Sequence, residues 1–333
     1  MNTGGNPLNI LCIGSIMCDV AFSPIEQGDA RRGGTFSIDQ FSIHGGGEGN
    51  NAAIDLARLG ETVRLVGRVG GDFIGDHLIR ELQKEGVDTL HVRQVPDKGT
   101  TISIQMISSV GARTMAAKRW GANETLTAQE VPDELIRWAD HVHIVGAMCL
   151  SGFDGEGSAR VFARAHELGK TTSMDLNNPR FEGPCFHLYK DALENCDLFL
   201  PSNYEIERSC GLTDLHEIRS FFRPFGIRAL VIKRSEQGIY VTDFDREFCL
   251  PSFLEGDPVD VVGAGDAFSS TFVSSWKRGK SLYECACIAS AASAKVLKSL
   301  GATRGMCDFA TLSDYARERA EALGLSPGEE DAR

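Results

Sequence analysis

Short apolar segments alternate with helix-like segments along most of this chain. The first apolar segment spans residues 8–14, and similar ones follow at 63–67, 141–146, 171–175, 198–200 and 229–232. Between them, apolar residues recur at helical spacing over 51–59, 73–85 and 157–168, and each of these segments is followed by glycine. Continuous apolar runs are typical of strands buried on both faces. The alternation therefore predicts an α/β fold of three layers, in which helices cover both faces of a mainly parallel sheet.

Two segments interrupt this alternation. Residues 19–43 and 100–119 show strand-like alternation with no helix between the strands, which predicts a small antiparallel flap, or lid, outside the main sheet. Helical segments around 282–300 and 312–323 close the chain, and the polar residues 326–333 predict a frayed tail. Because there is no internal repeat and no low-complexity linker, we expect one domain over residues 1–333.

Composition excludes several classes of protein. The 34 basic and 46 acidic residues give a net charge of −12, which argues against nucleic-acid binding because that function needs a basic face. No apolar window of about 18 residues predicts a membrane span, and the N-terminus has no signal-peptide pattern. Ten scattered cysteines without a C-x-x-C pair predict small buried side chains, not disulfides or zinc ligands. We therefore expect a cytoplasmic, soluble protein.

The most informative motif for chemistry is a Gly-Ala-Gly-Asp stretch that opens an apolar helix. Gly263, Ala264 and Gly265 leave backbone amides accessible at the positive end of that helix, which favours an anion. Asp266 follows in the first turn. A carboxylate at this position suits a general base that removes a proton from a hydroxyl while the amides hold a phosphoryl group. Taken alone, the stretch is more often a tight turn followed by a favourable first-turn charge.

A second glycine-rich stretch, residues 45–51, also precedes a helix. Its glycines allow a polar ligand to approach the backbone, and Asn51 offers a donor and an acceptor to a hydroxyl group. A turn with an asparagine helix cap is the alternative. Neither stretch follows the dinucleotide pattern G-x-G-x-x-G after the first strand, and a Walker A sequence is absent.

In this order, the two motifs resemble those of the ribokinase-like (PfkB) family of carbohydrate kinases, and the resemblance covers nearly the whole chain. Residues 15–19 resemble the family's first-strand motif, residues 46–60 its N-terminal signature, and residues 67–75 the strand-turn-helix that follows. Residues 263–266 match the C-terminal signature and place Asp266 at the catalytic-base position, with Gly263, Ala264 and Gly265 as the anion hole. The resemblance implies that the sugar is bound by Asp19, Gly46, Gly47 and Asn51.

The resemblance also implies ATP and Mg²⁺. Residues 175–180 resemble an Asp-x-Asn-x-x-Arg element near the phosphates, and residues 201–205 resemble an Asn-x-x-Glu motif that organises magnesium through water. A monovalent cation such as K⁺ is expected beside Asp260 and the backbone near Gly301. The expected nucleotide-binding residues are Asn177, Arg180, Ser202, Lys233, Ser235, Gly238 and Ser290, and the expected metal-site residues are Glu205 and Asp260.

Three single residues and one short segment depart from the family pattern. Glu48 stands where ribokinase has lysine, so ribose is not implied as the acceptor. Ser202 replaces the usual asparagine of the magnesium motif, unless Asn203 takes that role. Ser235 replaces a common glycine of the nucleotide loop, and residues 269–271 (Ser-Ser-Thr) replace a pair of small residues. Because the base and the anion hole are retained, we interpret these departures as changes of shape.

Three functions follow from the sequence. The first is an ATP-dependent sugar kinase that phosphorylates a primary hydroxyl, with the flap closing over the sugar and forming a homodimer contact. The second is a nucleoside kinase, which Phe22, Phe36 and Phe41 in the flap would suit. The third is a non-catalytic sugar-binding or regulatory protein, against which the retained Asp266 argues. His141 and His143 alternate with apolar residues, and at most one of them is expected to face the core.

Overall fold

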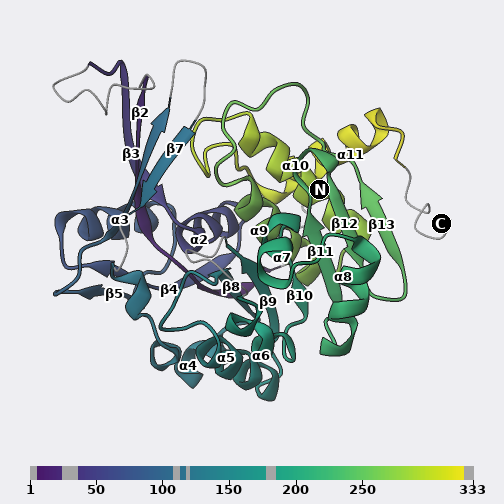
Figure 1. Ribbon diagram of the computed structural model, residues 1–333, viewed down its shortest axis with the longest axis horizontal. Coiled ribbons are helices and arrows are strands. Elements are labelled where there is room, and N and C mark those ends of the chain that lie inside the picture. Colours follow the sequence, from purple (N-terminus) through teal and green to yellow (C-terminus); the bar gives the residue numbers. More distant parts are fainter. Residues whose placement is uncertain (1–5, 25–36, 108–112, 118–120, 178–184, 326–333) are drawn as a thin grey trace.

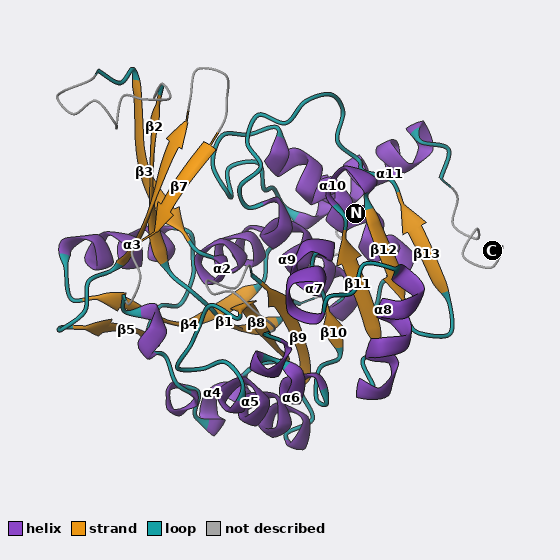
Figure 2. Cartoon of the chain, viewed as in Figure 1, coloured by secondary structure: helices purple, strands orange, loops and turns teal. Residues whose placement is uncertain are grey.

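A nine-stranded sheet forms the centre of the molecule. The computed structural model describes residues 6–24, 37–107, 113–117, 121–177 and 185–325. The strands of this sheet are parallel except for the last two along the chain, which form an antiparallel edge (Figures 1 and 2). In spatial order they are β13 (Glu247–Leu250), β12 (Ile239–Thr242), β11 (Ala229–Lys233), β10 (Leu198–Phe199), β9 (Thr171–Leu176), β8 (His141–Ala147), β1 (Asn9–Ile13), β4 (Thr62–Gly70) and β5 (Val92–Val95).

Helices cover both faces of this sheet, and the sheet separates the apolar core into two clusters. Ile10 and Cys12 of β1 belong to one apolar cluster, whereas Leu11 and Ile13 belong to the other, as the alternation of strand side chains requires. The first cluster includes α2 (Glu48–Arg58), α3 (Phe73–Lys84), α9 (Ala264–Lys277), α10 (Leu282–Leu297) and α11 (Phe309–Ala322). The second includes α4 (Asp133–Trp138), α5 (Glu156–Glu167), α6 (Lys190–Leu193), α7 (Asn203–Cys210) and α8 (Leu215–Phe222). The predicted three-layer α/β fold is confirmed.

A separate four-stranded sheet forms the lid, which rises beside α2 and α3 in Figure 1. Its order is β3 (Gln40–Gly46), β2 (Met17–Ser23), β6 (Thr101–Ile107) and β7 (Arg113–Ala117). The prediction of an antiparallel lid was wrong in one respect, because β2 and β6 are parallel. These strands come from two distant excursions, and each excursion supplies one antiparallel pair. Residues 25–36, 108–112 and 118–120 of the predicted lid and the predicted tail at 326–333 lie outside the described residues.

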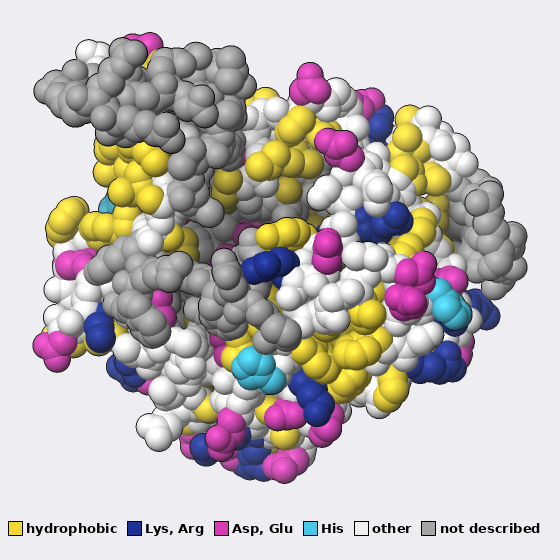
Figure 3. Space-filling view, viewed as in Figure 1, with side chains coloured by type: hydrophobic (Ala, Val, Ile, Leu, Met, Phe, Trp, Pro, Cys, Tyr) yellow, Lys and Arg dark blue, Asp and Glu magenta, His cyan; other side chains and the backbone are white. Residues whose placement is uncertain are grey.

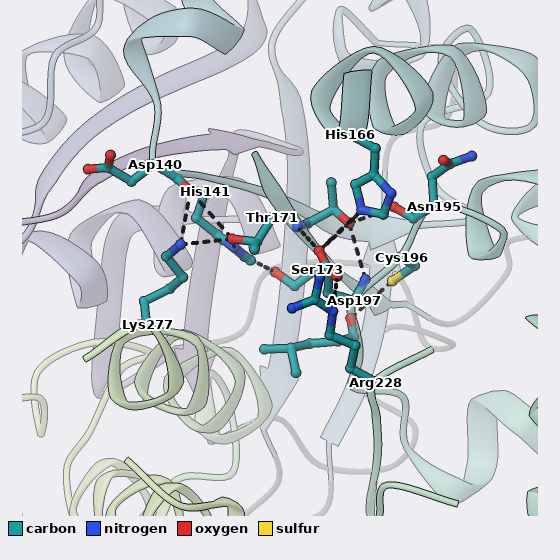
Figure 4. A network of polar contacts seen from close by, with 12 residues as sticks. Asp140, His141, His166, Thr171, Ser173, Asn195, Cys196, Asp197, Arg228 and Lys277 are labelled. Carbon is teal, nitrogen blue, oxygen red and sulfur yellow. Dashed lines mark hydrogen bonds and ion pairs between the residues drawn. The ribbon is translucent and has the colours of Figure 1, made fainter. Parts of the chain in front are cut away.

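The expectation that at most one of His141 and His143 faces the core was also wrong. Both rings are fully buried on one side of β8, since residues two apart in a strand point the same way. Ser173 Oγ lies 2.6 Å from Nε2 of His141 and 2.7 Å from Nδ1 of His143. Figure 4 shows how Lys277 continues this polar chain by donating to Thr171, which contacts His141. Burial lowers the pKa of both histidines, so they are neutral members of the core.

The cysteines behave largely as predicted. All ten are free thiols; seven are buried, and Cys249 is exposed. Among the described residues, no helix is both long and apolar enough to cross a membrane.

Candidate active site

The N-terminus of α9 has the geometry of an anion site. Gly263 precedes the helix with a φ of 81°, and a side chain there would overlap the carbonyl oxygen of Ala302, so only glycine fits. The amides of residues 264–266 lie in the first turn, where no helical carbonyl can accept them. Ser293 Oγ donates to the carbonyl of Ala264 at 3.0 Å and ties this turn to α10. The amides are therefore held at the positive end of a 14-residue helix.

Asp266 faces α2 from the first turn of α9. Its Oδ2 accepts a hydrogen bond from Asn51 Nδ2 at 2.8 Å. Burial raises the pKa of Asp266 well above its ordinary value, and the negative charge of Glu48 adds to the rise. Beyond the C-terminal end of α2, Glu61 accepts hydrogen bonds from Ser274 of α9 at 2.5 Å and from Arg278, the residue after α9, at 2.9 Å. The two contacts fix α2 against α9 at both ends and set the position of the carboxylate.

The residues expected at the sugar come together at the base of the lid. Asp19 on β2 is buried, and a side chain at Gly46 would overlap its carboxylate. Gly47 has a φ of 89° and precedes α2, which carries Asn51. Burial, and then the charge of Glu48, raise the pKa of Asp19 to about 6. Asp19, Asn51 and Asp266 therefore border one polar region between the lid and the main sheet.

Glu48 also borders the polar region of Asp19, Asn51 and Asp266, whereas in the sequence it stands out only as a departure from the family pattern. Its carboxylate accepts hydrogen bonds from Ser15 Oγ and from Asn177 Nδ2, in the segments that follow β1 and β9. A side chain at Gly146, in β8, would come within 2.9 Å of Glu48 Oε2. Asn177, which was predicted to lie near the phosphates, therefore also contacts a residue of the acceptor side. The Glu48 carboxylate therefore lies where the ends of the neighbouring strands β9, β8 and β1 come together.

A buried ion pair lies beneath the anion site. Lys233 Nζ lies 2.6 Å from each carboxylate oxygen of Asp175 and 3.1 Å from Ser269 Oγ. Although burial opposes its charge, the carboxylates of Asp175 and Glu205 hold the pKa of Lys233 above its ordinary value. The nearest atom to a side chain built at Gly265 would be Lys233 Nζ, at 3.7 Å. The sequence indicated Lys233 as a nucleotide contact but gave no sign of this pairing.

Ser202 and Glu205 cap the start of α7. The Ser202 amide donates to Glu205 Oε2 at 2.6 Å, and the Glu205 amide donates to Ser202 Oγ at 3.2 Å. Burial raises the pKa of Glu205 to about 7, against the lowering effect of Lys233. No group of three metal-binding side chains occurs within the described ranges. Glu205 therefore lies close enough to Lys233 and Asp175 for their charges to act on it.

The other expected nucleotide residues lie on separate elements. Ser235 has a φ of 52° in the turn after β11, and Gly238 has a φ of 78° and packs where a side chain would overlap the carbonyl of Leu250. Ser290 is buried on α10, which packs against α9. Arg180 falls within residues 178–184, which the structure does not describe.

Asp260 fixes the two segments that flank the anion site. Its Oδ1 accepts from the Val262 amide and its Oδ2 from the Gly301 amide, each at 3.0 Å. Asp260 therefore lies next to Gly301, as expected from the sequence.

Comparison with known proteins identifies the family to which the chain belongs. Residues 7–307 match the model of the pfkB family carbohydrate kinases. The chain is 29% identical to 2-dehydro-3-deoxygluconokinase of Bacillus subtilis over 253 residues, which is 73% of this chain and 77% of that protein. It is 28% identical to a nucleoside kinase of Methanothermobacter thermautotrophicus over 276 residues, 80% of this chain and 82% of that one. An E. coli protein described as a ribokinase II, solved with ATP and Mg²⁺, superposes with a TM-score of 0.79 at 21% identity, covering 94% of this chain and 99% of that one.

Proposed function

Since the chain belongs to the pfkB family of carbohydrate kinases, which phosphorylate alcohol groups of sugars and nucleosides, we propose that it transfers the γ-phosphate of ATP to a primary hydroxyl of a small carbohydrate. The observation that carries this proposal is the position of Asp266 beside the first-turn amides of α9, which no carbonyl of that helix can accept. A protein that only binds sugars would need no carboxylate there.

In the proposed reaction, Asp266 accepts the proton of the acceptor hydroxyl. The hydroxyl oxygen forms a bond to the γ-phosphorus as the bond to the β-phosphate oxygen breaks, and ADP leaves. The backbone amides of Ala264, Gly265 and Asp266 stabilise the negative charge on the transferring group. The raised pKa of Asp266 makes it a stronger base than an exposed carboxylate, which suits proton removal near neutral pH.

The acceptor is proposed to lie under the lid. Asp19 would accept hydrogen bonds from acceptor hydroxyls, Asn51 would orient both the acceptor and the base, and Gly46 and Gly47 would let the acceptor approach the backbone. Closing the lid would exclude water and limit wasteful hydrolysis of ATP.

The nucleotide is proposed to lie over the C-terminal part of the main sheet. Mg²⁺ supplies charge neutralisation and orientation for the phosphates. Glu205 fits it as a hard oxygen donor, and the lack of a three-ligand group within the described part of the chain fits an ion held mainly by phosphates and water. A monovalent cation would be held by Asp260 and carbonyls near Gly301. The proposed nucleotide contacts are Asn177, Arg180, Ser202, Lys233, Ser235, Gly238 and Ser290.

Substrate-dependent ADP release tests this function directly. The purified chain would be incubated with ATP, Mg²⁺ and a panel of sugars and nucleosides, with the Asp266→Asn variant as the control. Turnover of a sugar by the wild type but not by the variant supports the sugar kinase. Preference for a nucleoside would favour the second candidate, and binding of an acceptor without any ADP release would favour a non-catalytic protein.

Acceptor affinity is expected to depend on the protonation of Asp19. Its pKa of about 6 in the folded protein lies above that of an exposed aspartate, so it loses its negative charge as the pH falls through about 6. Protonation removes acceptor capacity, and we expect the Kd of the acceptor to rise by about tenfold between pH 7.5 and pH 5. Calorimetry in the Asp266→Asn background isolates this group from the base. The Asp19→Asn substitution should remove the dependence, and an unchanged slope would contradict the role of Asp19.

We further propose a homodimer formed through the lid. The inner face of the lid is polar and buried at Asp19 and Ser103, whereas its outer face exposes 61% of Phe41, 52% of Ile43 and 38% of Ile104. Apolar side chains gather at the place of these strands in Figure 3. The register places Val20 of β2 directly between Ile43 and Ile104, so these apolar residues form one continuous surface. An exposed apolar sheet face of this kind is typical of a surface that a partner covers.

Sedimentation equilibrium tests the dimer. We expect two chains per particle for the wild type and one for Phe41→Lys, because a buried unpaired charge opposes association. Substitution of Leu90, an exposed leucine outside the lid, by lysine should leave the dimer intact. A monomeric wild type at micromolar concentration would contradict the proposal.

A further inference from the structure

Glu48 places a carboxylate in the acceptor region itself. Glu48 is the first residue of α2, is half-buried, and lies three residues before Asn51, which contacts the base. It lies close to both Asp19 and Asp266, since it contributes to the pKa of both. Three carboxyl groups, from α2, the lid and α9, therefore lie near one another, with Asn51 contacting Asp266 and Gly46 packed against Asp19.

The carboxylate of Glu48 is fixed by neutral donors. Ser15 Oγ and Asn177 Nδ2 donate to its two oxygens, and neither carries a charge that would cancel it. Lys233, whose charge acts on Asp266, is already paired with Asp175, and Arg304, whose charge acts on His44, is exposed. The hydrogen bonds orient the carboxylate and leave its negative charge facing the region where the acceptor is expected.

We infer that Glu48 selects acceptors by charge: this kinase takes neutral polyhydroxyl acceptors and rejects acceptors that carry a carboxylate or a phosphate. The inference rests on the proposed function, because it assumes that the acceptor binds between Asp19 and Asp266. An acidic acceptor would add a further negative charge to three carboxyl groups and the incoming triphosphate. A unit charge about 6 Å away at the effective dielectric constant of a partly exposed site changes an equilibrium by roughly 10- to 100-fold. A neutral polyol meets no such repulsion and can donate hydroxyl hydrogens to the remaining lone pairs of Glu48.

Pairs of acceptors, one charged and one neutral, test the inference. The probes are ribonate with ribonamide, gluconate with gluconamide, and ribose 1-phosphate with methyl riboside; all retain a primary hydroxyl. We expect wild-type kcat/KM, measured by ADP release, to favour the neutral member of each pair by about tenfold or more. In Glu48→Gln, which removes the charge but keeps the length of the side chain, this ratio should fall by about tenfold. Glu48→Asp keeps the charge and should retain most of the preference.

Glu194→Gln is the matched control, because it makes the same change at an exposed position in the turn after α6. It should leave the ratio unchanged. The change of ratio separates charge selection from a structural role, since a loosened site would lower the turnover of both members together. A wild type that prefers the acidic member, or a Glu48→Gln variant whose ratio stays within a factor of about two of wild type, overturns the inference.

Failure of the inference is distinguishable from failure of the proposed function. Phosphorylation of either member of any pair supports the kinase, whichever member is preferred. If no member is phosphorylated, equilibrium binding of the same pairs to wild type and to Glu48→Gln decides the charge selection without turnover. Equal affinity of the wild type for both members, or binding of neither, would then count against it.

Discussion

Replacing Asp266 by asparagine is expected to lower kcat by about 10²-fold or more while the protein stays folded. The asparagine keeps the size of the side chain and a contact with Asn51 but cannot take up the hydroxyl proton. Because burial and Glu48 raise the pKa of Asp266 in the folded state, the folded protein resists ionisation of this group, and this costs stability at pH values above the ordinary pKa of an aspartate. The neutral variant should therefore be at least as stable as the wild type at pH 8.

Steady-state kinetics and thermal unfolding measure the two effects separately. Asp314→Asn, an exposed substitution on α11, serves as the control and should change neither quantity. Activity of Asp266→Asn within a factor of about two of wild type would refute its assignment as the base. A large loss of stability together with the loss of rate would point to a structural role instead.

Replacing Lys233 by methionine is expected to destabilise the fold by about 3–5 kcal/mol, because it leaves the carboxylate of Asp175 buried without its counter-charge. Both side chains are largely buried, so solvent cannot compensate. The free energy of unfolding is obtained from urea denaturation followed by circular dichroism.

The double substitution Lys233→Met with Asp175→Asn is the informative partner of this experiment. It removes both charges and should recover most of the lost stability, since a neutral pair has no uncompensated charge. Lys84→Met, which breaks an exposed ion pair with Glu81, should change stability by less than about 1 kcal/mol. Equal stability of Lys233→Met and the wild type would show that Asp175 becomes protonated at little cost.

The sequence was sufficient for six strands of the main sheet and for the glycine turn that opens α9, but not for β5 or for the antiparallel edge formed by β12 and β13. Buried parallel strands are continuous apolar runs, and the Gly-Ala-Gly turn has a local backbone requirement that its residues reveal. The lid was harder to predict, because whether β2 pairs parallel to β6 depends on a contact between segments about 80 residues apart. Local alternation predicts a strand but not its neighbour.

Side-chain partners were the least predictable part of the site. The pairing of Glu48 with Asn177 joins residues 129 positions apart, and that of Lys233 with Asp175 joins residues 58 positions apart. The position of Lys233 directly after an apolar run predicts that it lies at the end of a strand. It does not predict which carboxylate pairs with it. His141 and His143 were misjudged because a strand covered by helices buries both of its faces, and Ser173 supplies the partner that makes two buried rings tolerable.

The contact between Asn51 and Asp266 spans 215 positions of the chain. During synthesis, the N-terminal part would emerge from the ribosome long before α9 exists, and it would hold an acceptor region with no group to activate a hydroxyl. With Asp266 as the proposed base, catalysis would be withheld from every product that ends before α9, and phosphorylating activity would report that α9 has been made and has docked against α2.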